Sequence, residues 1–171
     1  MSKSTEKYIR FCKNLRSHLN HEDFMNFDDN ELESNHTFIQ IVFPTDISSK
    51  YNPNAPVISV QDFKNYIVQD EEIISKLKMS VEKILNFWGL NISNEEIYLV
   101  SRKRCKKLNY SNHNTLRFSR MLRSLILHGL SELSHKILNF VESLDFLCPS
   151  TKNGKTMWRI NYEESLRKME I

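Results

Sequence analysis

The sequence is poor in glycine, proline and cysteine. Only three glycines and four prolines occur in 171 residues, and both are concentrated outside the long periodic segments. Because turn-rich β architectures need frequent turn residues, this scarcity favours helices. The three cysteines are an odd number without a C-x-x-C spacing. They therefore indicate thiols in a reducing compartment and exclude a disulfide framework.

Long hydrophobic runs and a strong charge are also lacking. No run has the length of a signal-peptide core or of a membrane span, so we expect a soluble intracellular protein, either cytoplasmic or nuclear. Export by a specialised secretion system would leave no mark in these features. The formal net charge of +3 is small for a dedicated nucleic-acid binder. The length suits one domain with a substantial core, and we expect residues 1–171 to form it.

Apolar residues recur at helical spacing along most of the chain. Cap residues occur where these periodic segments begin and end: Asp28, Ser59, the capping box formed by Ser93 and Glu96, and the glycines Gly89 and Gly129. The pattern predicts helices within residues 8–19, 28–43, 59–67, 70–88, 93–107, 111–130 and 131–144.

Two segments break this pattern. Residues 44–59 contain the turn-rich "NPNAPVIS" and predict an ordered loop over the core. Near the end of the chain, Asn153-Gly154 favours a small hairpin, whereas Asn161 and Glu164 could instead cap a final short helix. The predicted fold class is therefore all-α, a single-domain helical bundle of about six to eight helices, with a small C-terminal hairpin as the open alternative.

The stretch "SNHNTLRFSRMLRSLILHGL" combines an apolar helix with a narrow polar stripe. At about 100° per residue, five polar residues share one side of this helix, opposite Phe118, Leu122, Leu125 and Ile126. The stripe consists of His113, Arg117, Arg120, Ser124 and His128.

Two interpretations of the stripe remain open. Arginine forks bind carboxylates and phosphates bidentately, which predicts a site for an anion or an acidic peptide. Alternatively, the arginines form an internal ion-pair network with Glu31 and Glu33 of the "ELESNH" segment, where His36 also lies.

The same segment carries a weak metal-ligand pattern. Glu33-x-x-His36 and Glu132-x-x-His135 each have the spacing of a carboxylate-bridged di-iron ligand pair. Glu132 lies in a predicted first helical turn, where an acidic residue is common for reasons of capping and helix dipole. We therefore predict no metal site and no cofactor.

A basic run follows the predicted capping box. Its cations could contact nucleic-acid phosphates, with Tyr98 and Tyr110 near enough to stack on bases, or they could form a solvated helix end. Cys105 lies among them and would have a lowered thiol pKa if its side chain were exposed. The run consists of Arg102, Lys103, Arg104, Lys106 and Lys107.

Four blocks of residues resemble the conserved domain of the opioid growth factor receptor family, in order and spacing. The resemblance covers residues 8–145 and leaves 146–171 as a C-terminal extension. One departure is Ile41, where the family usually has tryptophan. The matching residues are Glu31, Leu32, Glu33, His36, Ile39, Gln40, Phe43 and Pro44; Asn52, Pro53 and Ala55; Phe87, Gly89 and Leu90; and Leu116, Arg117, Arg120, Leu122, Ser124, Leu125, Gly129 and Leu130.

The resemblance implies a helical domain of proteins described as receptors for an enkephalin-type growth-inhibiting peptide. Our first hypothesis is a non-enzymatic binding module that recognises a peptide or protein partner, with the stripe as its anion-binding element. A nucleic-acid-associated domain using residues 102–107 is the alternative. A metal-dependent oxidoreductase is the third hypothesis.

Overall fold

The structure, a computed structural model, describes residues 1–15, 19–94, 96–110 and 112–169. The chain divides into two compact units, Met1–Lys83 and Ile84–Ile171, here called the N-terminal and C-terminal units. The described residues are mostly helical and include two small antiparallel sheets of two strands each. This confirms the predicted helical class, although ten α-helices occur in the described ranges where six to eight were predicted. Within these ranges no helix is long and apolar enough to span a membrane.

The N-terminal unit is built from short helices and the start of one long helix, which continues past the boundary between the units. Two predicted caps are confirmed: Asp28 Oδ1 accepts a hydrogen bond from the Glu31 amide at 2.8 Å, and Ser59 Oγ accepts one from the Asp62 amide at 3.1 Å. The elements are α1 (Lys3–Cys12), α2 (His21–Met25), α3 (Asp29–Ser34), α4 (Phe38–Val42), α5 (Val60–Asp62), the π-helical turn η1 (Phe63–Ile67) and α6 (Glu71–Phe87).

The helices of this unit differ from the prediction in three ways. The first helix ends at Cys12, and Asn14 takes a positive φ of 53°, so the predicted helix to residue 19 is wrong; residues 16–18 lie outside the described ranges. The predicted helix 28–43 is two helices, because the Asn35 side chain accepts a hydrogen bond from the Thr37 amide and turns the chain. The polar stretch before them forms α2, which the sequence pattern did not predict.

The loop at residues 44–59 is ordered, as predicted. Thr45 and Val57 form an isolated parallel bridge, and the Ile58 amide donates to the Thr45 carbonyl oxygen at 3.1 Å. Ile58 is fully buried. Its burial anchors the loop to the apolar core of the unit.

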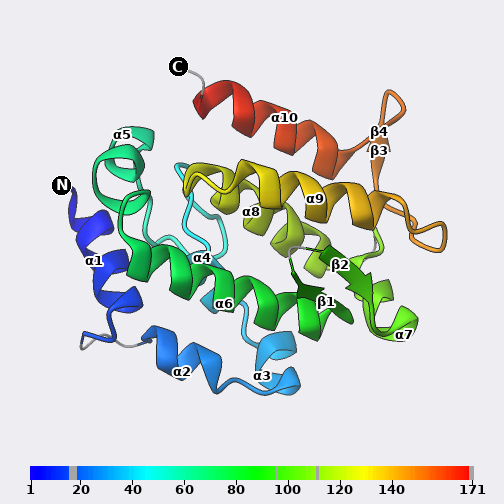
Figure 1. Ribbon diagram of the computed structural model, residues 1–171, viewed down its shortest axis with the longest axis horizontal. Helices are drawn as coiled ribbons and strands as arrows, with labels where there is room; N and C mark the ends of the chain where they lie inside the picture. Colours follow the sequence, from blue (N-terminus) through cyan, green and yellow to red (C-terminus); the bar gives the residue numbers. More distant parts are fainter. Residues whose placement is uncertain (16–18, 95, 111, 170–171) are drawn as a thin grey trace. The chain divides into compact units, whose positions relative to one another are not determined.

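In the C-terminal unit, α8 (Asn114–Leu127) packs against α9 (Ser131–Glu142) and α10 (Met157–Met169) (Figure 1). Gly129 has a φ of +78° directly after α8, as predicted for a helix-ending glycine. Ser131 is the first residue of α9, and the cap position is taken by Leu130. The elements are β1 (Leu90–Ser93), β2 (Glu96–Leu99), α7 (Arg102–Cys105), the 3-10 turn η2 (Lys106–Leu108), α8 (Asn114–Leu127), α9 (Ser131–Glu142), β3 (Thr151–Lys152), β4 (Lys155–Thr156) and α10 (Met157–Met169).

A hairpin replaces the first half of the predicted helix 93–107, while the basic end of that span is helical, as α7 and η2. Strands β1 and β2 pair antiparallel, with Ile92 opposite Ile97, so the predicted capping box at Ser93 and Glu96 is wrong. Asn94 has a φ of +51°, which turns the chain where the helix was expected to begin. Strand-forming aromatic and aliphatic residues after the turn favour the extended form.

The small hairpin and the final helix, which were predicted as alternatives for the C-terminal segment, both occur. Asn153 and Gly154 have positive φ angles and join β3 to β4, which confirms the predicted hairpin. The final helix, α10, follows directly. Its first turn is capped by Thr156, whose Oγ1 accepts from the Arg159 amide at 3.0 Å. The predicted cap residues, Asn161 and Glu164, lie inside the helix.

Aromatic residues form the centre of the C-terminal unit. Phe118 of α8 lies between Trp88 and Trp158, with ring centroids 5.7 Å and 5.0 Å away in edge-on geometry. Each indole donates a hydrogen bond: Trp88 to Asn114 Oδ1 at 3.1 Å and Trp158 to the Thr115 carbonyl oxygen at 3.2 Å. These contacts fix α8 and therefore the orientation of its polar stripe.

Candidate functional site

The first turn of α8 is held by side-chain hydrogen bonds. Asn112 Oδ1 accepts from the Asn114 amide at 2.9 Å, and Thr115 Oγ1 donates to the carbonyl oxygen of Asn109 at 2.9 Å. Asn114 and Thr115 are buried. The helix therefore starts at a defined residue, although Ser111, the predicted first residue, lies outside the described ranges.

The five stripe residues lie at different depths. His113 is exposed and Arg120 is half-buried, whereas Ser124 and His128 are fully buried. Arg117 is only 5% exposed, and its Nη1 donates to Asn114 Oδ1 at 3.3 Å. That same oxygen accepts the Trp88 indole hydrogen. Asn114, which the sequence analysis did not single out, thus connects a stripe arginine to the aromatic core.

His128 is neutral at pH 7. Burial lowers its imidazole pKa to about 4, against a smaller opposing effect of the hydrogen bond to Ser124. The Nδ1 atom lies 2.7 Å from the Ser124 carbonyl oxygen, so Nδ1 carries the hydrogen and donates it. The C-terminal half of the stripe is therefore buried and uncharged. The other members of the stripe are His113, Arg117 and Arg120, and anion binding by them stays a prediction.

The predicted acidic partners lie in the N-terminal unit. Glu31 is exposed, and its Oε2 accepts from the Asp28 amide at 2.8 Å, which completes a capping box on α3. Glu33 is half-buried and His36 is exposed. Their ion pairing with the stripe stays a prediction, because these residues and the stripe belong to different units.

The basic run forms α7 and η2, and two of its cations lie over aromatic rings. The Arg102 guanidinium is 4.4 Å from the Phe146 ring centroid, and Lys107 Nζ is 4.2 Å from that of Phe87. Arg102 also lies 4.0 Å from an Asp145 carboxylate oxygen. Arg102, Lys103 and Lys106 are exposed. Their charges are thus accessible from solvent.

Cys105 is not a reactive thiol. Its side chain is fully buried, and burial raises the thiol pKa to about 11. The lowered pKa considered for an exposed side chain is therefore excluded. Cys148, by contrast, is exposed, beside a surface hollow of about 440 Å³ lined by Asn109, Tyr110, Cys148, Pro149 and Ser150. The Tyr110 amide donates to the Cys148 carbonyl oxygen at 3.1 Å, which joins the two walls of the hollow.

A sharp corner links β2 to α7. The Gly89 carbonyl oxygen accepts hydrogen bonds from the amides of Val100 at 2.8 Å and Ser101 at 2.9 Å. A Cβ on Gly89 would lie 2.5 Å from the Ser101 carbonyl oxygen, so only glycine fits there. Ser101 Oγ then accepts from the Arg104 amide and caps α7. This corner fixes where the basic run begins.

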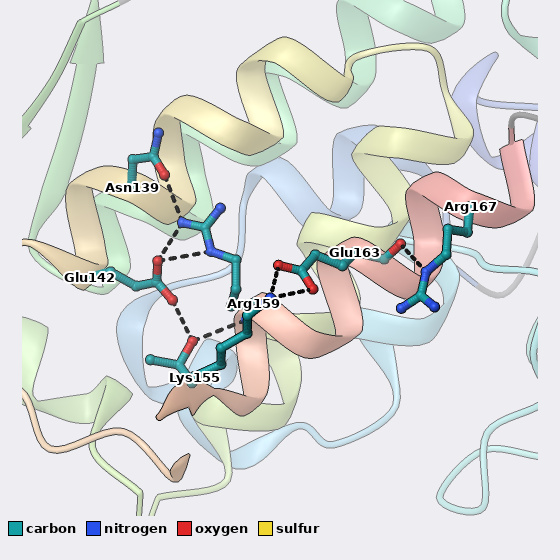
Figure 2. A network of polar contacts seen from close by, with 7 residues as sticks. Asn139, Glu142, Lys155, Arg159, Glu163 and Arg167 are labelled. Atoms are coloured by element: carbon teal, nitrogen blue, oxygen red, sulfur yellow. Dashed lines mark hydrogen bonds and ion pairs between the residues drawn. The ribbon is translucent and has the colours of Figure 1, made fainter. Parts of the chain in front are cut away.

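A polar network holds the C-terminal hairpin and α10 against α9 (Figure 2). Figure 2 shows Arg159 of α10 reaching Glu142 and Asn139 of α9; its Nη2 donates to both side chains. Thr156 of β4 donates to the other Glu142 oxygen. Lys155 Nζ lies 2.7 Å from a Glu163 carboxylate oxygen, which lowers the Glu163 pKa. The network positions α10, and no sequence pattern predicted it.

The weak metal-ligand candidates make other contacts. Glu132 pairs with Lys136 one turn along α9 at 3.9 Å, and the His135 ring packs beside Tyr162 with centroids 5.7 Å apart. Over the described part of the chain, no group of three His, Cys, Asp or Glu side chains could hold a metal ion. Neither Glu132 nor His135 therefore lies in a described cluster of metal-ligating side chains.

Comparisons with known proteins agree with the resemblance in the sequence. Residues 8–159 match the model of the opioid growth factor receptor conserved region. The human opioid growth factor receptor is 31% identical over 127 residues, which cover 70% of this chain and 18% of that protein. The opioid growth factor receptor-like protein 1 of Xenopus tropicalis is 29% identical over 104 residues, covering 57% of this chain and 20% of that protein.

The chain thus spans about a fifth of the length of these curated relatives. No solved structure matches it. Neither these comparisons nor the contacts of the basic run support a nucleic-acid partner. The family model, by contrast, matches from the middle of α1 to the first turn of α10, and so includes the stripe, the corner at Gly89 and the basic run. The chain belongs to the family of the opioid growth factor receptor conserved region.

Proposed function

We propose that this chain is a non-enzymatic binding module that recognises a peptide or protein partner. Its family membership supports a receptor-like role, since the relatives are named opioid growth factor receptors. An enkephalin-type peptide is the partner that the resemblance implies. Such a short peptide carries one carboxylate at its C-terminus, which gives the proposal a defined chemical probe.

The N-terminal half of the α8 stripe is the proposed anion-binding element. One observation carries this proposal: exposed His113 and half-buried Arg120 lie on the same side of α8 as Arg117, while the rest of the stripe is buried and neutral. A guanidinium fork matches a carboxylate in both shape and charge. Partial burial strengthens such a contact, because less water competes for the charges.

The test is fluorescence anisotropy with a labelled enkephalin-type pentapeptide in two forms, one with a free C-terminal carboxylate and one with a C-terminal amide. A hydrogen bond to a charged group stabilises by about 1.5–3 kcal/mol, so the amide should bind roughly tenfold more weakly or worse. Arg120→Gln should abolish the difference between the two forms. Lys136→Gln on α9, whose ammonium lies 3.9 Å from a Glu132 carboxylate oxygen, serves as the charge-matched control.

Equal affinity of the acid and the amide for the wild-type chain would contradict the anion-binding role of the stripe. Absence of binding by both peptides would contradict the enkephalin-type partner. Loss of discrimination in Lys136→Gln as well as in Arg120→Gln would mean that overall charge, and not the stripe, governs binding. Melting temperatures of all variants must be compared first, so that a folding defect is recognised as such.

A further inference from the structure

Three consecutive apolar residues at the end of β2 are exposed to solvent. Tyr98 is 39% exposed, Leu99 37% and Val100 60%. Single exposed apolar residues are common on soluble proteins, but a consecutive run next to charged residues is typical of interaction surfaces. We call this region the corner surface, and it consists of Tyr98, Leu99, Val100, Arg102, Lys103 and Lys106.

The backbone of the corner surface is held in one conformation. Gly89 accepts from two successive amides at the corner, those of Val100 and Ser101, and Ser101 caps the helix that follows. On the strand, the Tyr98 hydroxyl donates to the Ser93 carbonyl oxygen at 3.2 Å. Because the backbone is already held, a partner that covers these side chains orders only the side chains, which lowers the entropic cost of binding.

The charge next to these apolar residues has one sign. Residues 98–107 contain five cations and no acidic residue. Asp145 approaches Arg102 at 4.0 Å, but its side chain is 94% exposed and the pair is therefore weak. Glu96 lies at the far end of β2. The partner that complements this surface carries negative charge beside apolar groups.

The geometry of the strand distinguishes among anionic partners. Successive residues of a strand point to opposite faces, so Tyr98 and Leu99 lie on different sides of β2. A flat lipid surface covers one side only. Nucleic-acid phosphates would neutralise the cations but leave the aliphatic Leu99 and Val100 uncovered. A flexible peptide segment can contact both sides and the cations together.

From these observations we infer that the corner surface binds an acidic protein segment that also carries aliphatic or aromatic side chains. This site is separate from the α8 stripe of the proposed function, since the two share no residue. The aliphatic side chains of the segment cover Leu99 and Val100, and its carboxylates pair with Arg102, Lys103 and Lys106. The inference assigns the exposed members of the basic run to protein recognition.

The test is selection of a phage-displayed library of random 12-residue peptides on the immobilised full chain. Wild type should enrich peptides with an excess of Asp and Glu beside Leu, Ile, Val or Phe. The double variant Arg102→Glu, Lys103→Glu should instead enrich peptides with an excess of Lys and Arg. Lys152→Glu, an exposed reversal on the C-terminal hairpin, is the control and should enrich the same acidic peptides as wild type.

The most enriched acidic peptide is then synthesised and its affinity measured by anisotropy. Leu99→Ser, Val100→Ser should weaken it at least tenfold, while Arg120→Gln should leave it unchanged, which separates this site from the stripe. Enrichment without an acidic excess, or the same peptides on the charge-reversed variant, would overturn the inference. So would displacement of the peptide by a 12-nucleotide single strand or by phosphatidylserine vesicles, since either would assign the surface to another anion.

Discussion

Replacing Gly89 by alanine tests the corner on which the basic run depends. Gly89 has a φ of +73°, a backbone conformation that alanine adopts at a cost of about 1 kcal/mol. The added Cβ would lie 2.5 Å from the Ser101 carbonyl oxygen and 2.8 Å from Arg104 Cβ. The first of these contacts is with backbone, so the strand end must move away from Gly89.

This movement removes the two hydrogen bonds that the Gly89 carbonyl oxygen accepts from Val100 and Ser101. Each contributes about 1 kcal/mol net. Together with the cost of the backbone conformation, the variant should lower the free energy of unfolding by about 3 kcal/mol. Because a domain of this kind has a free energy of unfolding of only about 5–15 kcal/mol, that loss is a large fraction of its stability.

Gly154→Ala is the matched control. Gly154 has nearly the same φ, +74°, but a Cβ there would have nothing within 4 Å. Gly154→Ala should therefore lower the free energy of unfolding only by the cost of placing alanine at a positive φ, about 1 kcal/mol. The measurement is urea unfolding followed by circular dichroism for wild type and both variants. Equal losses in the two variants would refute the role assigned to the close approach between Gly89 and Ser101.

Three further predictions concern α10, the buried histidine and the cysteines. Arg159→Gln should lower the free energy of unfolding by about 1–3 kcal/mol, because the variant leaves the Glu142 carboxylate, itself 20% exposed, without its charged partner. In the same urea titration, Arg167→Gln should change the free energy of unfolding by less than about 0.5 kcal/mol, because the Arg167 contact lies within its own helix. The folded-state pKa of His128 lies below the ordinary value of 6.5, so the unfolded chain binds the proton more tightly. The contribution of neutral His128 to the free energy of unfolding, about 3 kcal/mol, is therefore complete above pH 6.5 and is lost as the pH drops towards 4. His128→Gln should flatten the dependence of the urea midpoint on pH in that window. A thiol reagent added to the native protein should label Cys148 alone within minutes, because the other two thiols are buried and burial raises their pKa values; rapid labelling of all three before denaturant is added would contradict this burial.

Helix ends were predictable where a single residue determines them. Asp28 and Ser59 cap helices as expected, and Gly89 and Gly129 take the positive φ that their positions after helices predicted. These signals are local: a side-chain oxygen or a missing Cβ acts within one turn. The family resemblance was likewise readable, because four blocks of residues keep their order and spacing.

The hairpin at residues 90–99 was not predictable from the same kind of signal. Ser93 and Glu96 have the spacing of a capping box, but the Asn94 φ of +51° and the strand-forming residues after it give a turn and a strand. A capping box stabilises a helix by about 1 kcal/mol, which cross-strand pairing and burial of Ile97 outweigh. The strand β2 also packs against α9, which is distant in sequence, and no local pattern contains that contact.

The α8 stripe shows the same limit in the candidate site. Helical periodicity predicts that its five residues share one side, but it says nothing of how deeply each is buried, because depth depends on the elements that pack beside the helix. Arg117 lies under its neighbours and donates to Asn114, so a variant there removes a buried hydrogen bond and reports on stability. Arg120 is half-buried, so a variant there tests the proposed anion binding. The same helical spacing therefore holds one arginine whose substitution tests stability and another whose substitution tests the proposed binding.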